Sequence, residues 1–225
     1  DLFSRQGVRW FHTGGIFAGL SDTTSEVIET AIKCAHRNGT IVSYDLNFRP
    51  SLWADFGGQQ RAQTINRRIA NFVDVMIGNE EDFTACLGFS VPDTSCDLLT
   101  LDTGNFRRMI EDVTSVFPNF SVVATTLLTV VTATKNHWGA LAWYDGQFAE
   151  ATYRPDLEIL DRVGGGDSFA SGLIYGLMKS NSIKSAVEYG AAHGALAMTT
   201  PGDTSMVSLA DVERLCRGGN ARVIR

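Results

Sequence analysis

Four consecutive residues in the last third of the chain carry the clearest chemical signal. Gly164, Gly165 and Gly166 are followed directly by an acid, Asp167, and then by apolar residues that recur every four positions, as on one face of a helix. Glycine lets a ligand approach the backbone closely and lets several N–H groups point at one spot. The start of a helix also carries the positive end of the helix dipole. The pattern therefore predicts an anion site suited to phosphate.

Asp167 has two interpretations that these residues leave open. As an ordinary helix cap, its carboxylate would stabilise the first turn by about 1 kcal/mol. Beside a phosphate, however, the same charge would repel the ligand unless it had another task. A carboxylate in that place can accept the proton of a hydroxyl group as its oxygen attacks phosphorus.

The segment 161–167 (Asp-Arg-Val-Gly-Gly-Gly-Asp) resembles the Asp-Thr-x-Gly-Ala-Gly-Asp signature of the ribokinase-type (PfkB) carbohydrate kinases. The resemblance implies that the three glycines form an anion hole and that Asp167 is the catalytic base. Arg162 stands where the family has Thr, and Gly165 stands where it has Ala. Neither difference removes the N–H donors or the carboxylate, but Arg162 leaves open how the start of this loop is held.

A second polar group follows an apolar strand pattern. Residues 40–46 are nearly all apolar, as expected of a parallel strand that is covered on both faces. Asp45, Asn47 and Arg49 alternate, so in an extended segment they would share one face. Ligands of open α/β sheets bind at the carboxyl ends of the strands, and arginine forks readily onto carboxylate or phosphate. A purely structural role, in which these side chains fix a loop before a helix, fits the pattern equally well.

This segment also resembles the Asp-x-Asn-x-Arg-x-x-Leu-Trp stretch of the 2-keto-3-deoxygluconate kinases within the same family. The resemblance implies that Arg49 and Asn47 bind the acid sugar, with Arg49 helping to hold it. It also implies that Asp45 and Asn47 lie close to the phosphates of the nucleotide. Residues 199–205 turn back near the glycine run in the family fold, and Asp203 resembles a sugar-contacting acid of these kinases.

A third polar group follows the apolar residues 73–77. Asn79 and Asp82 resemble the family's Asn-x-x-Glu motif, which manages Mg²⁺ through water, although Asp82 is one methylene shorter than the usual Glu. Mg²⁺ keeps several of its waters, so these groups need not touch the ion. The resemblance implies that Asn79 and Asp82 steer the metal, with Asn79 also near the nucleotide. The alternative is an acid-rich helix start, where negative charge is favourable in any case.

Three further matches concern the nucleotide and are weaker. Residues 132–139 are polar and stand where the family has a loop with a Lys-x-Gly-x-x-Gly-like pattern under the nucleotide. Lys135 and Gly139 match this pattern in part, but its middle glycine is absent. Ala191 stands where the family lines the adenine pocket.

Glycines recur inside two expected helices. Gly172 and Gly176 lie four residues apart in one of them, and Gly190 and Gly194 do so in the other. Each glycine costs about 1 kcal/mol relative to alanine inside a helix. We therefore expect these helices to pack very closely against each other, or to leave a flat space for adenine.

The rest of the chain alternates strands and helices. The expected strands cover residues 7–13, 40–46, 73–77 and 121–126, with a hairpin of 139–144 and 147–152 around an Asp-Gly turn. The expected helices cover residues 22–38, 62–72, 106–117, 183–198 and 209–216, besides the one at Asp167. The resemblance implies a ribokinase-like α/β three-layer sandwich with a mostly parallel central sheet, and one kinase domain over residues 1–225.

The composition is that of a globular protein, and it argues against a nucleic-acid-binding or membrane-spanning chain. With 44% hydrophobic and 20% charged residues, the 225-residue chain is an ordinary globular sequence that can bury a sizeable core. A net charge of −6 without any basic run argues against a nucleic-acid partner, and no apolar run approaches the roughly 18 residues of a membrane span. The 4 cysteines show no CxxC spacing, which favours reduced thiols and a cytoplasmic location.

The residues and the resemblance together predict ATP-dependent phosphorylation of a small sugar acid, with Mg²⁺ and with 2-keto-3-deoxygluconate as the substrate. The alternatives are a fructokinase, a ribokinase or a deoxy-keto-inositol acid kinase, and a catalytically silent sugar-binding homologue. Because the sequence runs from Asp1 almost directly into a strand pattern, we expect an N-terminal part of the kinase to be missing. In the family that part carries a lid sheet, through which a homodimer would form.

Overall fold

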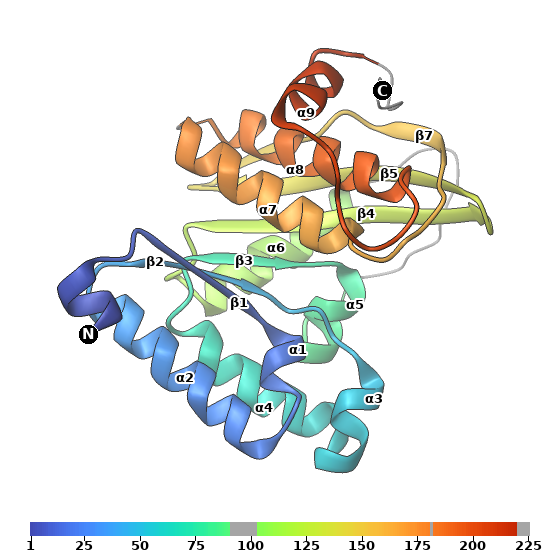
Figure 1. The fold of residues 1–225 in the computed structure, drawn as a ribbon. Coiled ribbons are helices and arrows are strands. Elements are labelled where there is room, and N and C mark those ends of the chain that lie inside the picture. Colours follow the sequence, from blue (N-terminus) through green and yellow to red (C-terminus); the bar gives the residue numbers. More distant parts are fainter. Residues whose placement is uncertain (91–102, 181, 220–225) are drawn as a thin grey trace. The chain divides into compact units, whose positions relative to one another are not determined.

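The computed structural model describes residues 1–90, 103–180 and 182–219 (Figure 1). The chain divides into two compact units, Asp1–Val123 and Ala124–Arg225. Both units combine strands with helices, so the α/β class is confirmed in each. The single kinase domain over residues 1–225 stays a prediction.

The first unit is built on three parallel strands, β1 (Trp10–Gly14), β2 (Ile41–Asp45) and β3 (Val75–Gly78). Trp10 lies opposite Ile41, and Ser43 lies opposite Val75. β3 is buried along its whole length and β2 along all but its first residue, which explains their nearly continuous apolar sequences. The three strands expected in this part of the chain are confirmed, with small shifts of their ends.

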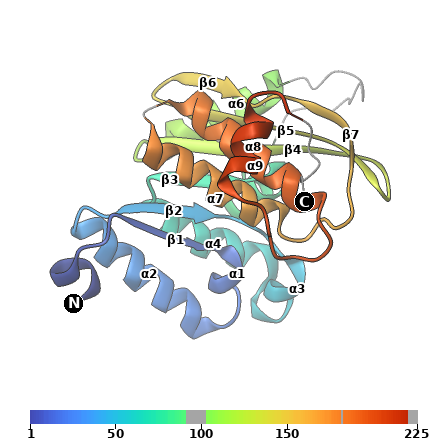
Figure 2. The same ribbon diagram turned by 45° about the horizontal axis from the view of Figure 1, so that its top comes forward.

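Helices follow each of these strands. They are α1 (Gly15–Ala18), α2 (Asp22–Arg37), α3 (Pro50–Trp53), α4 (Gly58–Ala70), α5 (Glu80–Asp82) and α6 (Gly104–Val116), with shorter 3-10 or π turns at Leu2–Gln6, Ala54–Phe56 and Phe83–Leu87. α2 and α4 lie side by side below β1 and β2 in Figures 1 and 2. Tyr44 of β2 is completely buried and donates to Asn66 of α4 at 2.7 Å.

α2 begins and packs as its sequence predicts. Ser21 forms a capping box with Thr24, which satisfies N–H groups that a helix start otherwise leaves free. Ile28, Ile32 and Ala35 recur at helical spacing and are buried. The helix expected over residues 22–38 is therefore confirmed.

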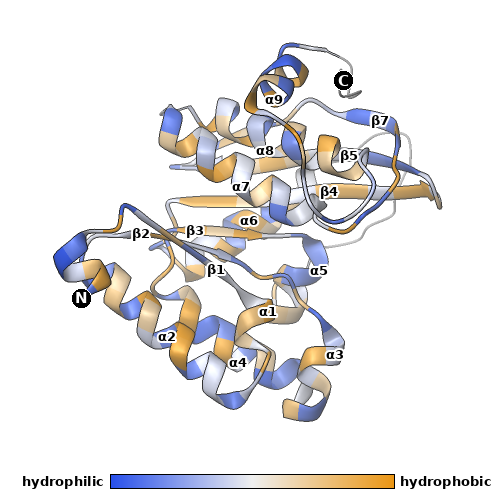
Figure 3. Cartoon of the chain, in the orientation of Figure 1, coloured by the Kyte–Doolittle hydropathy of each residue, from blue (hydrophilic) through white to orange (hydrophobic). Residues whose placement is uncertain are grey.

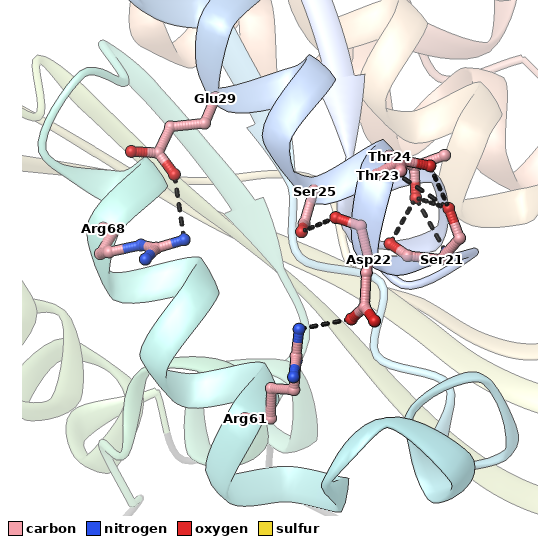
Figure 4. A network of polar contacts seen from close by, with 8 residues as sticks. All are labelled: Ser21, Asp22, Thr23, Thr24, Ser25, Glu29, Arg61 and Arg68. Carbon is pink, nitrogen blue, oxygen red and sulfur yellow. Dashed lines mark hydrogen bonds and ion pairs between the residues drawn. The ribbon is translucent and has the colours of Figure 1, made fainter.

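Ion pairs tie α2 to α4 (Figure 4). Arg61 of α4 pairs with Asp22 of α2, and Arg68 pairs with Glu29 at 3.1 Å. Both arginines are exposed, and exposed pairs of this kind contribute at most about 1 kcal/mol each. These two arginines of α4 are therefore explained by contacts with the neighbouring helix.

The second unit contains β4 (Val122–Thr132, which begins in the first unit), β5 (Lys135–Tyr144), β6 (Gln147–Glu150) and β7 (Arg154–Glu158). Figure 3 shows β4 largely in the colours of hydrophobic residues. β5 pairs antiparallel with β6 through residues 141–144 and with β7 through residues 135–138. Asp145 and Gly146 both have positive φ (46° and 78°), as the two central residues of a type I′ turn require, so the expected hairpin is confirmed.

Three helices complete the second unit: α7 (Gly165–Lys179), α8 (Ile183–Met198) and α9 (Leu209–Cys216). The bounds of α8 and α9 are those that the sequence predicts. None of the helices in the described part of the chain is both long enough and apolar enough to cross a bilayer.

α7 and α8 pack with their backbones in contact. A Cβ atom on Gly172 would lie 2.6 Å from the carbonyl oxygen of Tyr189, and one on Gly176 would lie 2.5 Å from the Cα atom of Ala186. Real Cβ atoms do not come this close to backbone, so only glycine fits at these positions. The expected close packing of the two glycine-containing helices is confirmed.

A buried ion pair fixes β7 to α8. Arg154 Nη2 lies 2.6 Å from Glu188 Oε1, and both side chains are about one-tenth exposed. The other oxygen of Glu188 accepts the backbone N–H of Thr152 at 2.6 Å. The pair therefore has the additional hydrogen bonds that a charge needs when it leaves water.

Candidate functional site

The glycine run forms the start of α7. Gly164 precedes the helix and has a left-handed backbone (φ 82°), which glycine adopts without strain. α7 begins at Gly165, so Asp167 lies within the first turn, and no side chain caps this helix. The interpretation of Asp167 as an ordinary helix cap is therefore wrong. We call residues 161–167 the anion loop.

Two backbone donors at this helix start are free. The N–H groups of Gly166 and Asp167 have no acceptor among the described residues, whereas the N–H of Gly165 points to the carbonyl oxygen of Arg162 at 3.4 Å. A Cβ atom on Gly166 would meet nothing within 4 Å. Open space thus lies beside free donors at the positive end of a helix, which is an arrangement that binds phosphate oxygens.

The carboxylate of Asp167 is available for chemistry. Its side chain is exposed, and it forms no hydrogen bond or ion pair with any residue that the structure describes. An acid that has no structural bond and stands next to free N–H donors can take up the proton of a bound hydroxyl group. Its role as the catalytic base stays a prediction that this geometry allows.

The loop after α8 lies against the anion loop. A Cβ atom on Gly164 would lie 2.6 Å from the carbonyl oxygen of Asp203. The expectation that residues 199–205 turn back near the glycine run is therefore confirmed. The carboxylate of Asp203 is exposed and accepts a hydrogen bond from its neighbour Thr204 at 3.2 Å. The backbone of Asp203 thus lies at the anion loop, and its contact with a substrate stays a prediction.

His193 of α8 connects this loop to α7. Its Nδ1 lies 3.0 Å from Ser171 Oγ, and its Nε2 lies 2.9 Å from Ser205 Oγ. Burial lowers the pKa of the imidazole, so the neutral ring donates to one serine and accepts from the other. The sequence alone gave no signal of this bridge, because the helical pattern does not show which loop folds back onto the helix.

Arg162 holds the start of the anion loop. Its Nη2 lies 3.1 Å from the carbonyl oxygen of Thr132, 3.4 Å from that of Ala133 and 3.3 Å from Asn136 Oδ1. The residue that departs from the family signature therefore fastens the loop to the turn between β4 and β5. This contact answers the question that the sequence left open.

The expected nucleotide loop at residues 132–139 is wrong, because residues from Lys135 onward belong to β5. Lys135 is exposed at the start of that strand, and Gly139 is buried inside it. Ala191 is completely buried in α8, where its carbonyl oxygen accepts the indole N–H of Trp138 at 2.8 Å. Contacts of Lys135, Gly139 and Ala191 with a nucleotide stay predictions.

In the first unit, Asp45 ends β2 and is only 9% exposed. Asn47 has a positive φ of 33°, so the chain turns there and is not extended. The expectation that Asp45, Asn47 and Arg49 share one face by alternation is therefore wrong. Asparagine tolerates this backbone better than most residues, which is the signal that the alternation argument missed. Arg49 is exposed, and its Nη1 donates to the carbonyl oxygen of Phe48 at 3.1 Å.

Asp82 joins the ends of two strands. Its Oδ2 accepts the backbone N–H of Asn79 at 2.8 Å, while Asn79 Oδ1 accepts the N–H of Asp82 at 2.9 Å in a capping box. Its Oδ1 accepts the N–H of Phe48 at 2.7 Å. Burial raises the pKa of this carboxyl, and the hydrogen bonds from Asn79 and Phe48 and the charge of Arg49 oppose that rise. Asp82 thus has a structural role, because its carboxylate holds the backbones of Asn79 and Phe48.

These contacts bear on the expected magnesium site. Both carboxylate oxygens of Asp82 and the amide oxygen of Asn79 already accept backbone N–H groups. The described residues contain no group of three or more His, Cys, Asp or Glu side chains placed to hold a metal ion. The described residues thus offer no all-protein cage for Mg²⁺, which usually binds through one or two carboxylates together with phosphates and water, and steering through water by Asn79 and Asp82 stays a prediction.

A groove of about 620 Å³ lies next to these residues in the first unit. Phe48 and Pro50, which flank Arg49, lie along it, as do Glu80 and Thr84 after Asn79. Burial raises the pKa of the Glu80 carboxyl. The segment of Asn47 and Arg49 and the segment of the predicted metal residues Asn79 and Asp82 therefore border a common groove, which the sequence alone did not reveal.

The fold and the anion loop define a class of protein. An α/β fold that offers free N–H donors at a helix start, with an unengaged acid in the first turn, has the parts of a phosphate-transferring site. Residues 8–209 match the model of the pfkB family of carbohydrate kinases. The chain belongs to this family.

Individual relatives agree with this assignment. The chain is 36% identical to the 2-dehydro-3-deoxygluconokinase of Thermotoga maritima, whose crystal structure it matches with a TM-score of 0.85 over 95% of this chain and 61% of that one. It is 29% identical to the 2-dehydro-3-deoxygalactonokinase of Haloferax volcanii, over 96% of this chain and 59% of the relative. It is 28% identical to the 5-dehydro-2-deoxygluconokinase of Geobacillus kaustophilus, over 87% of this chain and 53% of the relative.

The likeness to the Thermotoga maritima structure confirms the expected ribokinase-like α/β fold. The chain spans between about half and about three-fifths of the length of these three relatives. The three names agree on phosphorylation of a keto-deoxy sugar acid by those proteins but differ in the sugar.

Proposed function

We propose that this protein transfers the γ-phosphoryl group of ATP to a hydroxyl group of a small sugar acid in the cytoplasm. Its proposed substrate is 2-keto-3-deoxygluconate, which would become the 6-phosphate. The observation that carries the proposal is the start of α7, where the N–H groups of Gly166 and Asp167 have no acceptor among the described residues and the Asp167 carboxylate is exposed and unengaged.

The proposed reaction is a single displacement at phosphorus. Asp167 accepts the proton of the sugar hydroxyl while the hydroxyl oxygen forms its bond to the γ-phosphorus. The bond from that phosphorus to the bridging oxygen of ADP breaks, and ADP leaves with both electrons of that bond. The free N–H groups at the start of α7 stabilise the charge on the transferred group.

Magnesium is proposed to arrive with ATP. Mg²⁺ commonly binds through substrate phosphates and its own waters, with few protein ligands. It would neutralise charge on the phosphates while Asn79 and Asp82 stay at their structural hydrogen bonds. This arrangement agrees with the engagement of Asp82 by Asn79 and Phe48.

The preference for an acid sugar rests on Arg49 and on the relatives' names. Arg49 is exposed, and its bond to a backbone carbonyl leaves guanidinium donors for a carboxylate. Asn47, next to it, and Asp203, next to the anion loop, are the proposed partners of the sugar hydroxyls. A neutral sugar would offer the guanidinium of Arg49 no charged partner.

Other substrates remain competing proposals. The Geobacillus kaustophilus relative supports 5-keto-2-deoxygluconate, and the Haloferax volcanii relative supports the galactonate epimer. Fructose and ribose could be phosphorylated by the same reaction, but neither sugar has a carboxylate. A catalytically silent sugar-binding homologue is disfavoured by the free acid at Asp167.

The test is a coupled ADP-release assay of the full-length protein over a panel of sugars. The panel contains 2-keto-3-deoxygluconate, 2-keto-3-deoxygalactonate, 5-keto-2-deoxygluconate, fructose and ribose. We expect the highest kcat/KM on 2-keto-3-deoxygluconate, with formation of its 6-phosphate identified by mass spectrometry and NMR. Higher kcat/KM on fructose or ribose would contradict the acid preference, and no ADP release on any sugar would contradict a kinase.

A further inference from the structure

Carboxylates crowd the proposed phosphate site of the second unit. Asp161 and Asp167 lie in the anion loop itself, and the backbone of a third acid, Asp203, packs against Gly164. The whole chain also carries a net charge of −6. A nucleotide with two or three phosphates would meet repulsion here that two free N–H groups offset only in part.

Arg162 is the cation within this loop, and no carboxylate of the described residues forms an ion pair with it. Its hydrogen bonds to Thr132, Ala133 and Asn136 all use Nη2, and all three acceptors are uncharged oxygens. Its side chain forms no ion pair within the described residues, so Nη1 and Nε have no partner there. Nη1 and Nε lie on different edges of the guanidinium, so each can donate a separate charge-assisted hydrogen bond to a phosphate oxygen.

The backbone of Arg162 is part of the anion loop. Arg162 contributes the carbonyl oxygen that accepts the N–H of Gly165 at 3.4 Å. The Cα atoms of Arg162 and Gly164 are two peptides apart, hence separated by at most about 7.6 Å. The side chain of Arg162 therefore starts close to Gly164, and its guanidinium lies at the turn between β4 and β5.

The turn between β4 and β5 (Figure 2) keeps the side chain in place. Besides the contacts of Arg162, the N–H of Ile159 donates to the carbonyl oxygen of Thr134 at 2.9 Å, so the chain before the loop is fixed to the same turn. Asn136 is completely buried, and its Nδ2 has no hydrogen-bond partner among the described residues. Its Oδ1 is thus turned toward the guanidinium even though its amide nitrogen stays unsatisfied, which argues that orienting Arg162 is the task of Asn136.

We propose that Arg162 binds the phosphates of the nucleotide, with its guanidinium anchored by Nη2 on the β4–β5 turn and its remaining donors directed to the anion. This inference rests on the proposed kinase function and adds a residue to the same site. Asn136 is the positioning residue in this arrangement. The anchored arginine takes the position of the threonine in the family signature.

The test separates the charge of Arg162 from its role in holding the loop. Binding of ADP, AMP and adenosine to the full-length protein is measured by isothermal titration calorimetry. For Arg162→Gln we expect an ADP Kd on the order of tenfold higher than in the wild type, a smaller rise for AMP and no change for adenosine. Arg162→Lys should restore part of the affinity for ADP. Arg217→Gln, an equal charge change at the exposed end of α9, is the control and should bind ADP like the wild type.

Asn136→Asp provides the decisive variant. A carboxylate would then replace Asn136 Oδ1, which lies 3.3 Å from the guanidinium. It would strengthen the hold on the turn and neutralise the positive charge. We expect ADP affinity to fall as in Arg162→Gln. Wild-type affinity in Asn136→Asp would overturn the proposal and leave Arg162 as a fastener of the loop.

If Asn136→Asp does not fold, as judged by circular dichroism, the nucleotide series decides instead. A loss of affinity in Arg162→Gln that does not grow from adenosine to AMP to ADP would overturn the proposal. If the wild type is active and the Arg162→Gln variant binds ADP with wild-type affinity, only the inference about Arg162 is overturned. If the wild-type protein neither binds ADP nor produces ADP from ATP, the kinase function and this inference are overturned together.

Discussion

The Asp82 carboxylate lies 2.7 Å from the backbone nitrogen of Phe48, 34 positions earlier in the chain. Through this bond the start of α5, after β3, holds the segment that follows β2. That segment carries Asn47 and Arg49, so the placement of both proposed substrate residues depends on a side chain that the sequence suggested as a magnesium residue. Asp82 also closes a capping box with Asn79 at the start of α5.

Replacement of Asp82 by Asn should destabilise the protein. An amide can keep only one of the two oxygen acceptors and would turn an N–H group toward a backbone N–H. Loss of a buried hydrogen bond with an unsatisfied partner costs about 1–3 kcal/mol, which urea unfolding of Asp82→Asn would show. The exposed Glu81 in the same turn offers the matched control, since Glu81→Gln should unfold like the wild type. Equal unfolding midpoints for both variants would contradict the structural role.

Two glycines of α7 should respond to alanine in opposite ways. At Gly172 a methyl group would come within 2.6 Å of the Tyr189 carbonyl oxygen, so Gly172→Ala should cost about 1–3 kcal/mol through overpacking. At Gly166 a methyl group would meet no atom, so Gly166→Ala should keep or gain up to about 1 kcal/mol of stability. The same methyl group would occupy the space beside the free N–H groups and raise the KM for ATP. Thermal unfolding and ADP-release kinetics check both statements, and a normal KM for ATP in Gly166→Ala would contradict the phosphate site.

Much of this arrangement follows from local sequence. The bounds of α8 and α9, the turn at Asp145 and the buried strands β2 and β3 are set by helical or strand periodicity and by turn residues. The anion loop was also recognisable, because its glycines and Asp167 resemble the signature of the PfkB family. Such features need no knowledge of distant contacts.

The features that the sequence did not predict all depend on contacts between distant parts of the chain. β7 contains Pro155 and Asp156, the latter with φ 50°, and its sequence is typical of a turn. It is nevertheless a strand, because it pairs with β5 across a bulge and Arg154 is anchored to Glu188. The same pairing makes a strand of the polar residues around Lys135, which had suggested a loop. The positive φ of Asn47 likewise belongs to a segment whose next residue, Phe48, is held by Asp82.

The stability of the protein should depend on pH through His193. Burial lowers its pKa in the folded state below the value of about 6.5 that it has when unfolded. The unfolded chain then binds more protons than the folded one, so this contribution to stability is present above about pH 6.5 and is lost as the pH falls below it. His193→Gln should reduce the slope of unfolding free energy against pH between about 5 and 7, whereas His36→Gln on the exposed face of α2 should not. An unchanged slope in His193→Gln would contradict this assignment.

Arg49 should distinguish acid sugars from neutral ones. Without the guanidinium, the carboxylate of 2-keto-3-deoxygluconate loses its charged partner, so Arg49→Ala should raise the KM for that substrate by about 10-fold or more. The KM for ATP should stay within about twofold, because the nucleotide does not use this partner in the proposed arrangement. Any residual turnover of fructose should be equal in the variant and the wild type. Arg61→Ala, on the exposed side of α4, is the control, and an equal loss for both sugars in Arg49→Ala would contradict carboxylate recognition.

Asp167 is the proposed catalytic base, and replacing it distinguishes that role from the helix cap that the structure does not show. A helix cap would lose about 1 kcal/mol of stability in Asp167→Asn and little turnover. A base would lose about 10²–10⁴-fold in kcat, because an amide cannot accept the hydroxyl proton. The structure gives Asp167 no cap bond, so the unfolding temperature should not change. Removal of its charge beside the phosphates should leave ADP affinity unchanged or improve it. Stopped-assay kinetics, thermal unfolding and ADP calorimetry of this one variant therefore test the proposed base, and near-normal kcat would exclude it.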